Sequence, residues 1–279
     1  MYRDVYNAVL GSVAVLWSRK GLFFAIFIPY AIVLYVANMA GFAAVINGAD
    51  TNPAGSLSNI GIFIVGFFAV PVMLGVARAF LESGWDKEKA KALFAGMPLG
   101  KTFPSLFGIY MGILISTFVY AFVFFAIVWV VSLLPSFIAA AIFLVAFLYL
   151  IYTVPYYYGM AVAEGGFSRT IAIYLRPLYR PQEALSIAAS WRYFKHYLGY
   201  IVSIIIVILM LVVVTAAAAG VAVAVFHNLQ AAAITAGIVG GLLEIVTAMA
   251  PITVSVLFFD RIREGKASKA PEPETTTAE

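Results

Sequence analysis

Glu244 is the residue whose type and position most directly suggest chemistry, because this acidic side chain lies near the middle of a long apolar stretch, residues 233–258. An acidic group at the centre of a bilayer costs about 2–3 kcal/mol on insertion scales, and such groups mark transport paths and proton relays. One interpretation is therefore a protonatable or cation-binding group on a transport path. The other is structural: a neutral carboxylic acid that is hydrogen-bonded to Ser, Thr, Tyr or a freed backbone carbonyl. We favour the structural interpretation, because the other apolar stretches offer few polar side chains to line a path.

Small residues share the predicted helix face that carries Glu244. They recur at spacings of three or four residues and are Ala233, Gly237, Gly241 and Ala248. Residues with this spacing lie on one side of a helix. Small side chains allow transmembrane helices to approach each other closely. We therefore expect the Glu244 carboxyl to point into the helix bundle and away from lipid.

A basic segment between residues 183 and 196 could act at the membrane surface. Its sequence, EALSIAASWRYFKH, places apolar residues on one helical stripe and basic residues on another. Long basic side chains and tryptophan hold such a helix in the interfacial region. We therefore predict an interfacial basic helix that carries Trp191, Arg192 and Lys195.

A charged motif follows the last apolar stretch directly. It consists of Asp260, Arg261, Arg263 and Glu264. Cations at the C-terminal end of a helix interact favourably with the helix dipole. We expect these residues to lie at the inner membrane face, where they would stabilise the end of the last crossing.

The sequence lacks the residue constellations of known membrane enzymes. There are no cysteines, no HExxH motif and no Gly-rich phosphate loop. The four aspartates are expected outside the hydrocarbon, and His196 and His227 are expected on opposite sides of the membrane. We therefore predict no catalytic residues, no metal and no cofactor. A lipid-modifying enzyme is a third, weaker hypothesis, since it would require a polar cluster assembled across several helices.

Composition determines the class of protein. Hydrophobic residues make up 64% of the chain and charged residues only 11%, with a mean hydropathy of +1.01. A soluble domain could not bury so much apolar surface. Long continuous apolar stretches, rather than alternating ones, argue against an outer-membrane barrel. The fold class is therefore all-α: a polytopic transmembrane bundle with amphipathic interfacial helices.

Six apolar stretches are long enough to cross a bilayer, which needs about 20 residues per helix. We predict crossings at about residues 21–46, 59–81, 106–131, 137–160, 198–225 and 233–258. One six-helix domain would thus occupy residues 1–265, and a disordered cytoplasmic tail residues 266–279. A cleaved signal peptide is the competing interpretation of the first apolar stretch, but that stretch is longer than a signal peptide requires.

The connecting segments are more varied. Residues 2–17 predict an amphipathic helix, and Asp86 is the expected N-cap of a short helix that ends near Gly96 and Pro98. We expect a Gly/Asn/Pro loop over residues 47–58. Residues 164–180 are expected to form a loop, because Pro177 interrupts this segment and Pro181 follows it directly.

The distribution of basic residues predicts the orientation. All 17 Lys and Arg residues fall in the segments on one side of the six crossings, or at the helix ends that face that side. Because short-loop basic residues remain in the cytoplasm, we expect both termini to be cytoplasmic and the protein to reside in the cytoplasmic membrane. This asymmetry explains the net charge of +4 without nucleic acid. It indicates membrane lipids, including anionic head groups at the cytoplasmic face, as partners.

Two segments carry a resemblance to a known group. The segment Glu183–Ile201 and the ending Pro251–Gly265 (PITVSVLFFDRIREG) are similar to those of a broad, mostly uncharacterised group of prokaryotic six-helix membrane proteins. That group includes the membrane domain fused to some glycerophosphodiester phosphodiesterases. The resemblance implies a structural role for the charged motif at 260–264. The phosphodiesterase activity is not carried over, because we expect no catalytic domain within these 279 residues, and the basic insertion Phe167–Arg180 departs from the group's pattern.

The functional hypotheses follow from these observations. We favour a non-catalytic multi-pass protein that organises the membrane, handles lipid or holds a protein partner, including a second copy of itself. The alternative is a small-solute or ion transporter that uses Glu244.

Overall fold

The protein is all-helical over the part of the chain that the structure describes. The computed structural model describes residues 2–46, 54–226 and 229–267, which form eleven helices and no strand. The six long helices are α2 (Lys20–Ile46), α3 (Ala54–Glu82), α5 (Leu99–Val131), α6 (Ser136–Glu164), α10 (Trp191–Phe226) and α11 (Leu229–Ala267). The five shorter helices are α1 (Tyr2–Trp17), α4 (Lys87–Gly96), α7 (Phe167–Tyr174), α8 (Arg176–Tyr179) and α9 (Pro181–Ala188).

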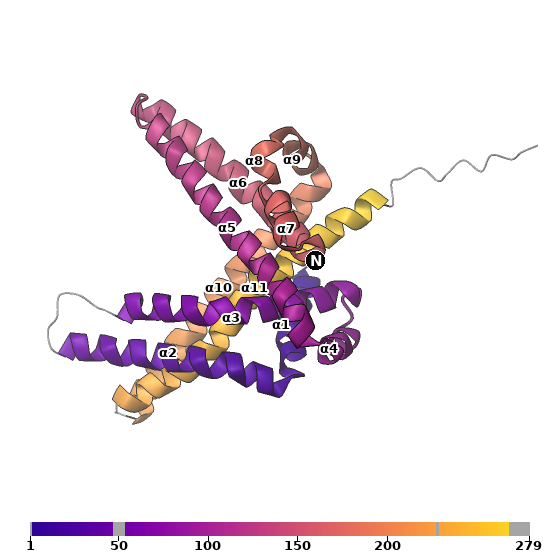
Figure 1. Ribbon diagram of the computed structural model, residues 1–279. Helices are drawn as coiled ribbons and strands as arrows, with labels where there is room; N and C mark the ends of the chain where they lie inside the picture. Colours follow the sequence, from indigo (N-terminus) through magenta and orange to yellow (C-terminus); the bar gives the residue numbers. More distant parts are fainter. Residues whose placement is uncertain (1, 47–53, 227–228, 268–279) are drawn as a thin grey trace, which may run out of the picture.

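The long helices form three antiparallel pairs. Figure 1 shows α2 with α3, α5 with α6, and α10 with α11, and the pairs diverge from a common centre. The shorter helices gather at the end away from the tips of the pairs. We call this region the charged end: α1, α4 and α7–α9, together with the adjoining ends of the long helices.

Five helical segments are long and apolar enough to cross a membrane. Among the described residues they are Lys20–Ala40, Ser58–Glu82, Leu99–Val131, Ser136–Glu164 and Ala233–Glu264. Their lengths exceed the roughly 20 residues that a bilayer requires. The fold is therefore compatible with a multi-pass membrane protein.

Helix α11 is the centre of the bundle, since it packs against α10, α2, α6, α1 and α3. Two glycines of α11 allow α2 to approach closely: a Cβ atom at Gly237 would lie 2.9 Å from the carbonyl oxygen of Ala31, and one at Gly241 2.9 Å from the Ala31 nitrogen. The prediction that this stripe of small residues permits close helix contact is confirmed. At the other end of α11, a Cβ atom at Gly159 of α6 would lie only 2.1 Å from the carbonyl oxygen of Ser255.

Two predictions for the short helices at the N-terminal half are confirmed. Helix α1 forms over residues 2–17, and the Asp86 carboxylate caps α4 by accepting hydrogen bonds from the backbone nitrogens of Glu88 and Lys89, at 2.9 and 3.1 Å. Helix α4 ends at Gly96. Helix α4 was predictable because a capping interaction spans only three residues, and α1 because the helical spacing of apolar residues is also a local signal.

The loop predicted for residues 164–180 is wrong over most of its length. Residues 167–174 and 176–179 are helical, and Thr170, Ile173 and Pro177 are buried. Pro177 is the second residue of α8 and Pro181 the first residue of α9, and proline is tolerated in a first helical turn because no intrahelical donor is needed there. The prolines therefore separate short helices instead of forming a loop.

The interfacial basic helix is also not a single element. Helix α9 ends at Ala188, and α10 begins at Trp191 and continues for 36 residues. The hydroxyl of Ser190 accepts a hydrogen bond from the Tyr193 backbone nitrogen at 3.2 Å, which caps the new helix. Trp191, Arg192 and Lys195 thus lie in the first turns of a long helix.

Several predicted boundaries differ from the helix ends. Helix α5 begins at Leu99, before the predicted crossing at residues 106–131, and α6 continues to Glu164, beyond the predicted crossing at residues 137–160. A helix can extend past the hydrocarbon into the interfacial region. Residues 54–58, expected in a loop, belong to α3, and Lys266 and Ala267, expected in the disordered tail, belong to α11. Residues 47–53, 227–228 (including His227) and 268–279 lie outside the described part of the chain.

Candidate functional site: grooves and charges at the charged end

Arg78 is a half-buried cation that closes the end of α6. Its Nε atom donates a hydrogen bond to the carbonyl oxygen of Val162 at 2.7 Å, and its Nη2 atom donates to that of Gly165 at 2.8 Å. The last carbonyls of a helix have no intrahelical partner and carry partial negative charge. Arg78 therefore joins α3 to the C-terminal end of α6, a role that no sequence pattern indicated.

Arg19 makes an equivalent contact with α4. Its guanidinium donates to the carbonyl oxygens of Ala95 and Met97 and lies 5.3 Å from the centre of the Phe94 ring. Cations are attracted to the face of an aromatic ring. The interaction fixes α4 against the turn between α1 and α2.

The predicted C-terminal motif forms two ion pairs. Asp260, only 5% exposed, accepts hydrogen bonds from Nη2 of Arg263 and from Nε1 of Trp85, both at 2.9 Å. Arg261 pairs with Glu264 at 3.2 Å. The Trp85 contact connects α11 to the turn between α3 and α4, where Trp85 itself adopts a left-handed conformation with φ of 68°. A non-glycine residue there is held by its surroundings, which here include stacking on Phe80.

The structure brings the two predicted basic segments together. Nε and Nη2 of Arg192 both donate to the carbonyl oxygen of Arg261, at 3.2 and 2.6 Å. Beside this contact lies a pocket of about 390 Å³, whose lining includes both arginines together with Lys195, His196 and Glu264. Burial and the positive charges of Arg192, Arg261 and Lys195 lower the pKa of His196, so the imidazole is neutral at pH 7.

Glu244 lies apart from these charges. Asp260 follows it on the same helix, and at a rise of 1.5 Å per residue the two are about 24 Å apart. The Glu244 side chain is half-buried and close enough to Tyr30 of α2 to interact with it electrostatically. Tyr30 is only 1% exposed. Glu244 therefore lies near Tyr30 of α2, on the helix that carries the small-residue stripe. That its carboxyl points away from lipid stays a prediction.

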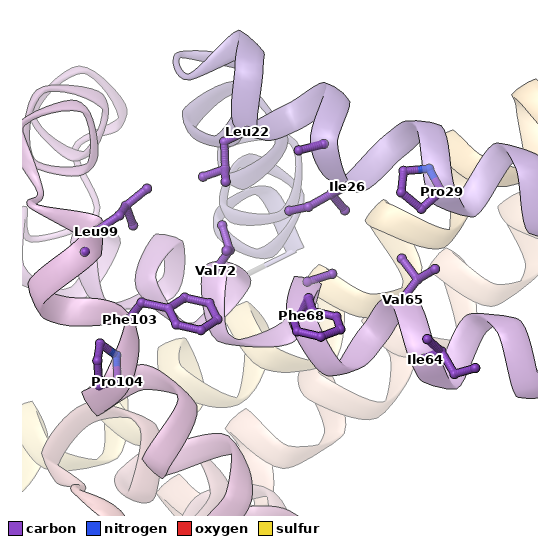
Figure 2. A pocket seen from close by; sticks show the side chains of 13 residues that line it. Leu22, Ile26, Pro29, Ile64, Val65, Phe68, Val72, Leu99, Phe103 and Pro104 are labelled. Carbon is purple, nitrogen blue, oxygen red and sulfur yellow. The ribbon is translucent and has the colours of Figure 1, made fainter.

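Two larger grooves are lined mainly by apolar side chains. The first, about 690 Å³, lies between α2, α3 and the start of α5. Figure 2 shows Leu22, Ile26 and Pro29 on one side of it and Phe68 and Phe103 on another. The second, about 940 Å³, lies between α6, α9 and α10. Glu244 lines none of these three cavities.

Within residues 2–46, 54–226 and 229–267, no three His, Cys, Asp or Glu side chains gather into a possible metal site.

Comparisons with protein families, curated proteins and solved structures yield no match for this chain.

Proposed function

We propose that this chain is a six-crossing protein of the cytoplasmic membrane that holds phospholipid in lateral grooves and catalyses no reaction. In this proposal α10 is the sixth crossing, since residues 198–225 contain no charged side chain. Both termini and the charged end face the cytoplasm, which is supported by the position of the Lys and Arg residues. We also propose that the chain belongs to the six-helix group that its two segments resemble.

The observation that carries the lipid-binding proposal is the apolar groove between α2, α3 and α5. Its volume of about 690 Å³ lies in the range of small-molecule sites. It is open to the outside, because two of its lining residues, Ile64 and Phe68, are 56% and 63% exposed. All of its lining side chains are apolar, which suits an acyl chain and offers no side-chain group for chemistry.

The position of the groove supports a lipid with its head group at the charged end. Leu22 follows Lys20 closely in α2, and Gly100 precedes Lys101 in α5. Both lysines are exposed. An acyl chain in the groove would therefore begin at the level of two cations, which attract lipid phosphates.

Photo-cross-linking tests this proposal. Proteoliposomes with a phosphatidylcholine that carries a diazirine on its acyl chain should give cross-links in the peptides that line the groove. Replacing the exposed lining residue Ala25 with Trp should remove most of them by filling the groove. Ala126→Trp is the matched control, since Ala126 is exposed on α5 away from the groove. Cross-links that are unaffected by Ala25→Trp would refute the groove as a lipid site.

The proposed orientation has a separate test. The chain contains no cysteine, so a single cysteine placed at Lys101 or Ser132 can be labelled without background. An impermeant maleimide added to intact cells should label position 132 and not position 101. The reverse pattern would exclude the orientation without bearing on the groove.

Transport is the second candidate function, and the position of Glu244 favours it. The Glu244 carboxyl is half-buried near Tyr30 inside a predicted crossing. An acidic group is costly to insert there, and the acidic groups found in such positions are usually functional. Glu244→Gln keeps the shape and removes the ionisable group. Unchanged proton or solute flux into proteoliposomes of this variant would exclude a carrier that depends on Glu244.

A further inference from the structure

The pocket between α1, α10 and α11 combines a basic rim with an apolar floor. The rim is formed by Arg192, Lys195, His196, Arg261 and Glu264. The floor is formed by Val5, Val254, Leu257 and Phe258, all of them buried. With the histidine neutral, three permanent cations face one carboxylate. The rim therefore has a net positive charge.

Two of the cations are held in fixed positions. Arg192 donates two hydrogen bonds to the Arg261 carbonyl oxygen, and the Arg261 side chain pairs with Glu264 at 3.2 Å. Both guanidinium groups retain further N–H donors, since each has five. Orienting the side chains before a ligand arrives reduces the entropy lost on binding. Planar guanidinium groups in this state suit the oxygens of a phosphate.

The surroundings of the pocket match the depth of lipid head groups. Trp191 and Phe194, on the same turns of α10 as the cations, are 75% and 44% exposed, and their rings stack with centres 5.4 Å apart. Exposed aromatic side chains of this kind are enriched where the membrane meets water. The next residues of α10 enter the apolar stretch that begins at Leu198. A ligand with a phosphate beside the rim could thus continue along the apolar floor.

We propose that this basic pocket binds the phosphate of an anionic phospholipid, with Arg192, Lys195 and Arg261 around the phosphate and the start of an acyl chain against Leu257 and Val5. The inference rests on the proposed lipid-binding function and adds a second site that is selective for head-group charge. The pocket volume of about 390 Å³ accommodates a head group and the start of a chain, but not a whole phospholipid. The remainder of the lipid would lie in the bilayer.

Binding of short-chain lipids to the full-length protein in detergent tests the inference. We expect dioctanoyl phosphatidylglycerol to bind saturably and about tenfold more tightly than dioctanoyl phosphatidylcholine, because both lipids carry the phosphate but phosphatidylcholine adds a quaternary ammonium cation that the basic rim repels. Lys195→Gln should weaken phosphatidylglycerol binding about tenfold, as expected for the loss of one charge-assisted hydrogen bond. Because Lys195 is exposed and lies outside the Arg192–Arg261 contact, this variant should fold normally.

Two further arms decide between sources of affinity. The variant Lys89→Gln removes as much charge from an exposed position outside the pocket and should leave binding unchanged; an equal loss would overturn the inference. Inorganic phosphate should bind far more weakly than the lipid, and equal affinity would identify a free-phosphate site and refute the lipid assignment. Because the phosphatidylcholine cross-links report only on the α2–α3–α5 groove, either proposal can fail alone.

Discussion

The outer part of the α5–α6 hairpin (residues 121–151) and the crossing of α6 with α11 are built from similar apolar residues in different ways. In the outer part, Phe122, Leu133 and Phe137 are 74%, 75% and 74% exposed. At the crossing, Phe259 is 2% exposed and Gly159 touches the backbone of Ser255. Lipid tails are as apolar as leucine, so an exposed position needs only hydropathy, whereas a helix contact needs a particular shape. The two regions should therefore respond very differently to the same change in side-chain volume.

Replacing Gly159 with Leu should have the largest effect. A Cβ atom there would lie 2.1 Å from the Ser255 carbonyl oxygen, and a backbone atom cannot move aside as a flexible side chain can. We expect a loss of about 3 kcal/mol or more in unfolding free energy, at the upper end of overpacking effects. The midpoint of unfolding in a denaturing-detergent titration, together with the yield of folded protein, measures it.

Ala126→Leu in the exposed part of α5 is the control for this prediction. An added side chain there meets no packed neighbour, so the change should stay within about 0.5 kcal/mol. Similar losses in both variants would show that the outer hairpin is covered by protein, such as a second copy of the chain, and would end the distinction between the two regions.

The same distinction explains which features could be predicted from the sequence alone. Hydropathy predicted the long helices, and local capping predicted α4, because each of these signals lies within a short segment. The partners of Arg78 could not be predicted, since Val162 lies 84 residues away along the chain. Likewise, the spacing of Arg192 and Arg261 predicted two separate surface segments, while the fold places them in one pocket.

Residues 164–180 show a second limit of sequence interpretation. Proline either ends a helix or begins one, and the pattern around Pro177 and Pro181 does not distinguish these outcomes. The fold does so through long-range hydrogen bonds: the hydroxyls of Tyr120 and Tyr149 donate to the carbonyl oxygens of Tyr174 and Pro177, both at 2.7 Å. These bonds place α7 and α8 against the α5–α6 hairpin.

Arg78→Met should have the next largest effect, because it removes both hydrogen bonds to the end of α6. Leaving these carbonyls unpaired should cost about 2 kcal/mol. Arg78→Lys should recover little, since an ammonium group cannot reproduce the two-pronged contact. The unfolding midpoint in the same denaturing-detergent titration measures this loss. A loss of this size would show that polar contacts at the charged end also depend on geometry.

Arg169→Gln is the matched comparison for Arg78. The Arg169 side chain pairs with Glu164 at 3.2 Å but is 66% exposed, so its loss should cost less than about 1 kcal/mol. If Arg78 and Arg169 gave equal effects, the cap on α6 would be no more important than a surface ion pair.

The smallest effect is expected at Asp86, which is exposed and lies outside the packed core. Hydrogen bonds from the backbone nitrogens of Lys89 and Glu88 lower the pKa of its carboxyl. Because the folded pKa lies below the unfolded one, the cap contributes fully above the ordinary carboxyl range and is lost as the pH falls through the lowered value. Asp86→Asn should retain the cap without this pH dependence, whereas Asp86→Ala should lose it at every pH.

Amide hydrogen exchange in α4 measures this prediction, with the aspartate and asparagine proteins compared at each pH so that intrinsic exchange rates cancel. We expect Glu88 and Lys89 to exchange faster in the aspartate protein only at acidic pH. The unfolding midpoint of the whole bundle should stay constant, because the cap affects only the exposed first turn of α4, whereas Ala90 and Phe94 further along the helix are buried in the core. A pH-dependent midpoint that disappears in Asp86→Asn would instead make the first turn of α4 part of the cooperative core, and the packed region would then extend beyond the α6–α11 crossing.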